Sequence, residues 1–261
     1  ILESSDFKIL RPAGNTKYYV TPIIRMISAL KQESLTPDDL LLIIDQQQES
    51  LSGMQKIHEK GAHKGKVRGE YTKLQRVIDK NREFYFAYTQ YEALLKNEGL
   101  YDFEDMLLSA IKALKDNEDM LRDLQETYQY VLADEHQDVN GSQNTLLELL
   151  VTYHSNPNIF AVGDEKQAIY RFQGASLENF LYFEEKFPGT QDISLVDNYR
   201  SGQKILDSSH SLVETEDEEL SKLRVQLRSV SGREASVEVR DFSHQAVEDE
   251  SVVEIIKSTL A

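Results

Sequence analysis

Apolar residues recur at helical spacing along the first part of the chain, which predicts a series of amphipathic helices. Thr36 is a good N-cap for one of them, because proline follows it at the first helical position. Gly99 comes after the longest apolar face and is a suitable C-terminal cap, and Asp102 is expected to cap the next helix. The expected helices are Tyr18–Lys31, Pro37–Gln48, Leu74–Leu95 and a helix from Asp102 through Leu114.

The second part of the chain alternates short apolar runs with helical patterns. Strand, helix, strand and helix with short connections predict a parallel sheet covered by helices, and therefore an α/β fold. The expected strands are Tyr128–Ala133, Asn158–Val162, Asp192–Val196 and Ser236–Phe242, and the expected helices are Gln143–Thr152, Ser176–Phe187, Gln203–Val213 and Val247–Leu260.

Composition excludes several classes of protein. The chain has 261 residues, of which 40% are hydrophobic and 28% charged, a globular balance. The sequence contains no cysteine, which excludes disulfides, thiolate metal sites and cysteine nucleophiles, and fits a reducing, cytoplasmic location. No apolar run approaches the roughly 20 residues that a membrane-spanning helix needs, so no membrane partner is expected.

The charge of the chain is unevenly distributed. A net charge of −16 argues against a surface that coats nucleic acid non-specifically. From Lys56 to Arg82, however, nine basic residues stand against three acidic ones. Gly61, Gly65 and Gly69 interrupt this basic stretch, which predicts a mobile loop. A local basic groove is therefore compatible with the negative net charge of the chain.

Three expected strand ends carry unusual chemistry, and ligands of parallel sheets bind at such ends. Asp134 and Glu135 form an adjacent carboxylate pair, as magnesium–nucleotide hydrolysis requires, because one carboxylate holds the hydrated metal and the other acts on the attacking water. After the second strand, Gly163 permits a tight turn and Gln167 can contact a terminal phosphate. After the third, Arg200 can meet the charge of a transferring phosphoryl group. Taken singly, each feature is equally typical of a solvated strand end, packing or helix capping.

Aromatic residues accompany two of these blocks. Tyr170-Arg171-Phe172 places a cation between two rings, which suits stacking on unpaired bases. Tyr199 can stack on a purine in the same way. Simple packing would explain an isolated aromatic triplet as well.

Together, the three blocks resemble motifs II, III and IV of the UvrD/PcrA/Rep helicases of superfamily I. Asp134-Glu135-His136-Gln137-Asp138 is similar to the family's Asp-Glu-aromatic-Gln-Asp, with His136 in place of Tyr or Phe. The block from Gly163 to Ala175 is similar to Gly-Asp-x-x-Gln-x-Ile-Tyr-x-aromatic-Arg-Gly-Ala, with Gln173 where Arg is usual. Asn198-Tyr199-Arg200-Ser201 matches outright, and Tyr101–Leu108 is similar to the family's Asp-Phe-x-Asp-Leu-Leu helix. The resemblance is strong from about Gly99 to Val213.

The resemblance implies an ATP- and Mg²⁺-dependent motor that moves 3′ to 5′ on single-stranded DNA. Asp134 would bind Mg²⁺, and Glu135 would act on the hydrolytic water. Gln167 would contact the γ-phosphate, Arg200 would serve as an arginine finger and Tyr199 would stack near the adenine. The implied site residues are Glu135, Gln167 and Arg200 for catalysis, Asp134, Gln137, Asp164 and Tyr199 for the nucleotide and metal, and Tyr170, Arg171, Phe172, Lys64, Lys66 and Arg68 for DNA.

The resemblance also implies a domain plan. Residues 1–97 would be a mostly helical insertion, residues 98–200 a partial RecA-like P-loop NTPase core, and residues 201–261 the start of a second RecA-like domain. The sequence contains no Gly-x-x-x-x-Gly-Lys-Thr/Ser loop for the β- and γ-phosphates. We therefore expect an internal fragment of a longer helicase, and little or no ATPase activity from this chain alone.

Two other interpretations stay open at this stage. The sequence Glu165-Lys166-Gln167-Ala168-Ile169-Tyr170 also resembles the corresponding motif of RecB- and AddA-type subunits, in which a nuclease domain follows the motor. A DNA-binding scaffold module that has lost hydrolysis is the alternative of another class. Under the motor interpretation, the expected partners are single-stranded DNA, single/double-strand junctions and accessory subunits of DNA repair or recombination.

Overall fold

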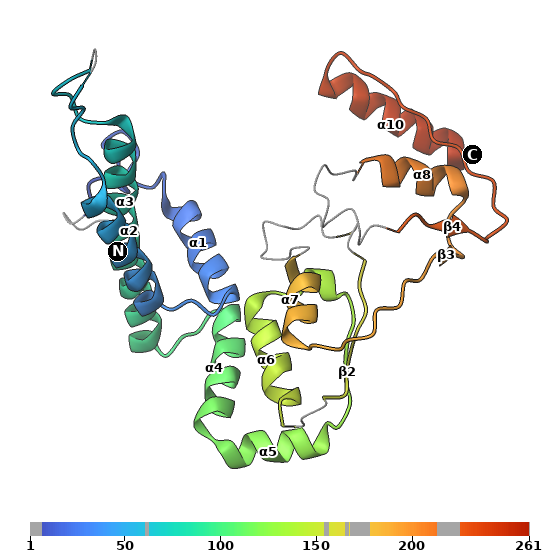
Figure 1. Ribbon diagram of the computed structural model, residues 1–261. Coiled ribbons are helices and arrows are strands. Elements are labelled where there is room, and N and C mark those ends of the chain that lie inside the picture. The colour runs from blue at the N-terminus through green and yellow to red at the C-terminus, as the bar shows by residue number, and fades with distance from the viewer. Residues whose placement is uncertain are drawn as a thin grey trace. The chain divides into compact units, whose positions relative to one another are not determined.

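A computed structural model describes residues 7–60, 63–153, 157–164, 167, 178–212 and 225–260. The chain divides into two compact units, Ile1–Lys186 and Phe187–Ala261. The described parts are mostly helical and contain two small parallel sheets, one in each unit (Figure 1). The mixed α/β class is thus confirmed, whereas the RecA-like core and the three-part domain plan stay predictions.

The first three helices of the first unit enclose its hydrophobic core. They are α1 (Val20–Gln32), α2 (Pro37–Gly53) and α3 (Gly69–Glu98), and α2 lies along α3 (Figure 1). Ile44, Leu51 and Ile78 are at most 1% exposed between them. Burying such side chains contributes roughly 1.5–3 kcal/mol each, which stabilises the helices against each other.

Local signals set the ends of these helices as the sequence predicts. Thr36 and Asp102 each form a reciprocal capping box with the third residue of the helix that follows. Gly99 ends α3 with φ 64°, a left-handed conformation that glycine adopts without steric cost. Within the Gly-broken basic stretch between α2 and α3, Ile57 bridges Val67 in antiparallel fashion, and the expected mobility of this stretch stays a prediction.

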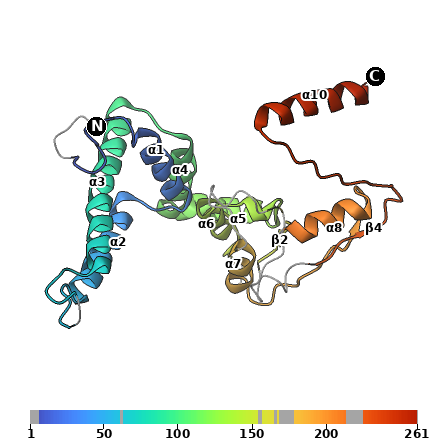
Figure 2. The same cartoon turned by 90° about the horizontal axis from the view of Figure 1, so that it is seen from above.

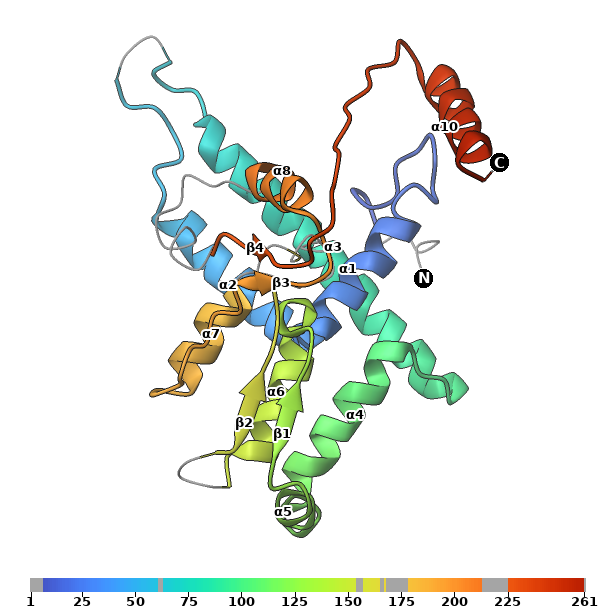
Figure 3. The same ribbon diagram turned by 90° about the vertical axis from the view of Figure 1, so that its right-hand side faces the viewer.

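The rest of the first unit contains a β–α–β arrangement. Strands β1 (Val131–Ala133) and β2 (Ile159–Ala161) pair in parallel, and α6 (Gly141–Val151) connects them. Figure 3 shows the two strands side by side with α6 next to them. The 3₁₀ turn η1 (His136–Asp138) lies between β1 and α6. The other helices are α4 (Phe103–Asp116), α5 (Glu118–Thr127) and α7 (Glu178–Lys186).

Helix α5 was not predicted from the sequence. Its sequence contains only three apolar residues, Met120, Leu121 and Leu124, and they lie on one face of the helix. Asn117 starts the helix, because its side chain accepts a hydrogen bond from the backbone N–H of Met120. The predicted strands at β1 and β2 were right in place but too long.

The second unit contains β3 (Asp197–Asn198), α8 (Gln203–Leu212), β4 (Arg228–Ser229) and α10 (Gln245–Leu260). Figure 2 shows the extended segment that leads from β4 to α10. The predicted strands Asp192–Val196 and Ser236–Phe242 were wrong. Leu195 and Val239 in these segments are 77% and 91% exposed. In the described residues, β3 pairs with β4 only from Asp197 on, and the preceding Val196 carbonyl accepts the backbone N–H of Arg228 at 2.9 Å. The two predicted helices of this unit are confirmed within the described residues.

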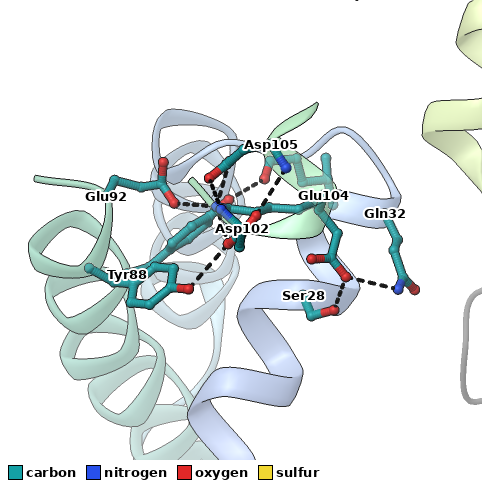
Figure 4. Close-up of polar contacts among 10 residues, drawn as sticks. Ser28, Gln32, Tyr88, Glu92, Asp102, Glu104 and Asp105 are labelled. Carbon is teal, nitrogen blue, oxygen red and sulfur yellow. Dashed lines mark hydrogen bonds and ion pairs between the residues drawn. The ribbon is translucent and has the colours of Figure 1, made fainter. Parts of the chain in front are cut away.

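A buried lysine joins three helices of the first unit. The ammonium of Lys31 in α1 lies 2.7 Å from Glu92 of α3, and 2.7 and 2.6 Å from Asp102 and Asp105 at the start of α4 (Figure 4). Its side chain is 1% exposed. Its carbonyl oxygen accepts a hydrogen bond from the Ser142 hydroxyl at 2.7 Å, which adds the first turn of α6. We call Lys31, Glu92, Asp102 and Asp105 the lysine junction.

Hydrogen bonding outweighs burial at the lysine junction. Burial alone would lower the pKa of Lys31, but hydrogen bonds to Asp102, Asp105 and Glu92 raise it well above its ordinary value. Burial alone would likewise raise the pKa of Asp102, yet hydrogen bonds from Lys31 and from the Asp105 backbone lower it. The charged forms are therefore the stable ones inside this junction.

Candidate functional site

The chain turns sharply just after β1, at the predicted carboxylate pair. Glu135 has φ 51° and ψ 42°, a left-handed conformation that is uncommon for a residue with a side chain. The Asp134 carboxylate accepts the Glu135 backbone N–H at 2.9 Å, and Asp138 N–H bonds back to the Glu135 carbonyl at 2.9 Å. Both side chains of the pair are exposed. Strain held in this way is typical of functional loops, and here it presents two carboxylates to solvent.

Gln137 connects this loop to the end of β2. Its side-chain amide donates to Oε2 of Glu135 at 2.6 Å and accepts the backbone N–H of Asp164 at 3.0 Å. Asp164 in turn accepts the Gln167 side-chain amide at 2.9 Å, and Gln167 N–H bonds to the Asp164 carbonyl at 3.0 Å. Glu135, Gln137, Asp164 and Gln167 thus form one hydrogen-bonded series, which we call the strand-end network.

His136 faces the opposite way from Glu135. Its ring is buried, with 1% exposure, and meets the Phe183 ring of α7 edge to face at 5.3 Å between centroids. The histidine that replaces the family's usual aromatic residue therefore packs inward and anchors the turn. The tight turn expected at Gly163, which follows β2, stays a prediction, because residues 165 and 166 lie outside the described part of the chain.

The carboxylates fit a hydrated magnesium ion better than a protein-only metal cage. In the described part of the chain, no group of three or more His, Asp or Glu side chains could hold a metal. Mg²⁺, however, needs only one or two protein carboxylates when waters and nucleotide phosphates supply the remaining ligands. Asp134, exposed beside Glu135, is suited to that partial role.

Two predicted site residues belong to the second unit. The Asn198 side chain accepts the backbone N–H groups of Arg200 at 3.0 Å and Ser201 at 2.8 Å, which shapes the turn after β3. Tyr199 is 74% exposed and Arg200 is also exposed. Their expected approach to Glu135 and Gln167 stays a prediction. The predicted DNA contacts Tyr170, Arg171 and Phe172 lie outside the described residues.

Exposed basic side chains occur both in the stretch before α3 and around a hollow beside α3. Exposed Lys64 and Lys66 and partly exposed Arg68 come from the stretch between α2 and α3. Lys73, Arg76 and Lys80 line an open hollow of about 660 Å³, whose wall includes Tyr19. The Lys80 ammonium lies 5.1 Å from the centre of the Tyr19 ring. We call Lys73, Arg76 and Lys80, which line this hollow, the basic surface.

Neither the lysine junction nor the bridging role of Gln137 is evident from the sequence. Nothing in the sequence around Lys31 distinguishes it from a surface lysine, because its partners lie about 60 to 75 positions away. The position of Gln137 inside the block from Asp134 to Asp138 indicated a functional residue, but the family resemblance implied a contact with the nucleotide and not a link within the protein. Searching the described helices for membrane spans also finds none that is long and apolar enough to cross a bilayer.

Comparisons with known proteins give this geometry a context. A sequence model of the UvrD/REP helicase N-terminal domain matches residues 3–188. The ATP-dependent DNA helicase PcrA of Leuconostoc citreum is 36% identical over 136 residues, which cover 52% of this chain and 18% of the relative. The ATP-dependent DNA helicase Rep of Escherichia coli K12 is 36% identical over 135 residues, 52% of this chain and 20% of the relative. The matched region thus spans about a fifth of these helicases, and the chain belongs to the UvrD/REP helicase family.

Proposed function

We propose that this chain forms part of the motor of an ATP-dependent DNA helicase that translocates 3′ to 5′ on single-stranded DNA during repair or recombination. The relatives are ATP-dependent DNA helicases, which supports the reaction class. The observation that carries the proposal is the strained turn at Glu135, which exposes two carboxylates at the carboxyl end of a parallel strand. Ligands of α/β sheets bind at that edge.

The chemistry we propose for the site assigns one task to each exposed group. Bound Mg²⁺ would neutralise phosphate charge, and Asp134 would hold it through its hydration shell. Glu135 would orient the attacking water and take its proton, while Gln167 would sense the γ-phosphate. Arg200 would stabilise the charge of the transferring phosphoryl group from the second unit.

The fold we propose around this site is a partial RecA-like core. The parallel strands β1 and β2 with the connecting α6 support this proposal and would be the described part of such a sheet. Residues 1–97 would form a helical insertion and residues 201–261 would begin a second domain of the same kind. This function does not require a metal site in which protein side chains supply every ligand, because waters and nucleotide phosphates would supply the remaining ligands of Mg²⁺.

DNA would contact two regions of the chain. The basic surface offers three cations around one hollow in a chain of net charge −16, so a polyanion is its proposed ligand. Lys64, Lys66 and Arg68, which precede α3 in the sequence, would extend this contact. Tyr170, Arg171 and Phe172 would line the path of the unpaired strand by stacking. Junctions between single and double strands, and accessory repair subunits, are the proposed partners of the whole protein.

Replacing Glu135 with glutamine tests the motor directly. In the whole protein, Glu135→Gln should abolish DNA-stimulated ATP turnover and leave nucleotide affinity within about threefold, because it removes the base but keeps the shape of the side chain. Glu126→Gln changes the same charge on an exposed position of α5 and should leave turnover unchanged. Full turnover by Glu135→Gln would refute the assignment.

A further inference from the structure

Gln137 is the buried member of the strand-end network. Its side chain is 1% exposed, whereas Glu135 and Gln167 are exposed. A carboxylate can only accept hydrogen bonds and a backbone N–H can only donate one, so a single orientation of the Gln137 amide satisfies both Glu135 and Asp164. The amide is therefore committed to the protein and faces away from solvent.

The contact with Gln137 fixes the carboxylate of Glu135 at one oxygen. Oε2 accepts the Gln137 amide at 2.6 Å, and within the described residues no protein group is bonded to Oε1. An exposed glutamate otherwise samples several rotamers, and ordering it is entropically unfavourable. One hydrogen bond from a buried donor thus leaves the second oxygen directed and open.

The same amide extends the connection between the two strands beyond their ends. Val162 N–H bonds to the Ala133 carbonyl at 2.8 Å, and His136 N–H bonds to the Val162 carbonyl at 2.9 Å. Gln137 makes the next link, to the backbone of Asp164, whose carboxylate holds the Gln167 amide. A shift of the Asp164 backbone is therefore transmitted to Glu135 through one side chain.

We propose that Gln137 is a positioning residue that couples the orientation of Glu135 to the backbone of Asp164, whose carboxylate accepts the Gln167 amide. The sequence analysis placed Gln137 among the nucleotide contacts, but its two bonds within the protein support this different role. The inference rests on the proposed function, since it assumes that Glu135 acts on the hydrolytic water. Positioning errors of about 1 Å reduce turnover by about 10²-fold, so a single lost bond is sufficient.

Gln137→Met tests the coupling with two separate measurements. Methionine has a similar length and no amide, so it fills the space and removes both bonds. In the chain described here, exchange of the Asp164 amide hydrogen, followed by NMR, should accelerate about fivefold or more, the factor expected for loss of one hydrogen bond. In the whole protein, kcat should fall about 10²-fold while nucleotide affinity stays within about threefold.

Gln125→Met is the matched control, because Gln125 is a buried glutamine of the same unit whose amide donates to the Leu149 carbonyl at 2.6 Å. It should lower stability but leave Asp164 exchange and the kcat of the folded protein near those of the wild type. Unchanged Asp164 exchange in Gln137→Met would overturn the coupling. Accelerated exchange with unchanged kcat, in a protein that Glu135→Gln inactivates, would overturn the positioning role. If Glu135→Gln itself retains turnover, the proposed function fails, and the role of Gln137 in turnover fails with it.

Discussion

Replacing Lys31 with methionine should strongly destabilise the first unit. Methionine keeps most of the apolar stem but removes the ammonium that faces Glu92, Asp102 and Asp105 at 2.6–2.7 Å. Removing one partner of a buried ion pair typically costs about 3–5 kcal/mol, because the remaining charges lose their compensation. The three carboxylates are 18–35% exposed and regain some water, so we expect the lower end, about 3 kcal/mol.

Urea unfolding, followed by hydrogen exchange of the α1 and α3 amides, measures this loss in the unit where it occurs. Lys112→Met, at an exposed position of α4, removes the same charge without buried partners and should change the free energy of unfolding by less than about 0.5 kcal/mol. A loss as small as this in Lys31→Met would refute the argument that the junction holds three helices together.

The pH dependence of the same variant checks the electrostatic origin of the effect. Because the folded pKa of Asp102 lies below its ordinary value of 3.8, this carboxylate contributes stability above that value, and the contribution is lost as the pH falls through the folded pKa. The wild type should therefore lose stability steeply below about pH 4. Lys31→Met should show a weaker loss there, since the main donor that lowers the pKa of Asp102 is gone.

Two further predictions concern DNA and turnover. Arg76→Glu on the basic surface should weaken DNA binding, and the slope of the logarithm of the binding constant against the logarithm of salt concentration should fall by about one phosphate contact. Fluorescence anisotropy at several salt concentrations measures both quantities. Lys115→Glu at an exposed position of α4 is the control, and equal effects of the two substitutions would contradict a local contact. In the whole protein, Arg200→Ala should lower kcat about 10³-fold or more with little change in nucleotide affinity. Arg200→Lys should recover only part of the lost turnover, because lysine lacks the planar guanidinium group. Turnover of Arg200→Ala equal to that of the wild type would exclude an arginine finger.

Helix ends and the sequence motifs of the site could be predicted from residues that are neighbours in the chain. Thr36, Gly99 and Asp102 set helix boundaries through bonds within a few positions of themselves, so the sequence predicted them correctly. The carboxylate pair after β1 was likewise recognisable, because strand and loop residues are adjacent in the chain. The strands of the second unit were mispredicted, since pairing depends on a partner segment rather than on the apolar run itself.

By itself, the sequence determined the family, the alternation of helices and strands in the first unit, and the residue types of the site. Only the tertiary structure decided that Lys31 is buried among three carboxylates and that Gln137 bonds Glu135 on one side and Asp164 on the other. Local patterns record interactions across a few residues, whereas these contacts join positions 27 to 74 apart in the chain, apart from the short link between Gln137 and Glu135. Such contacts depend on packing, which no single segment encodes.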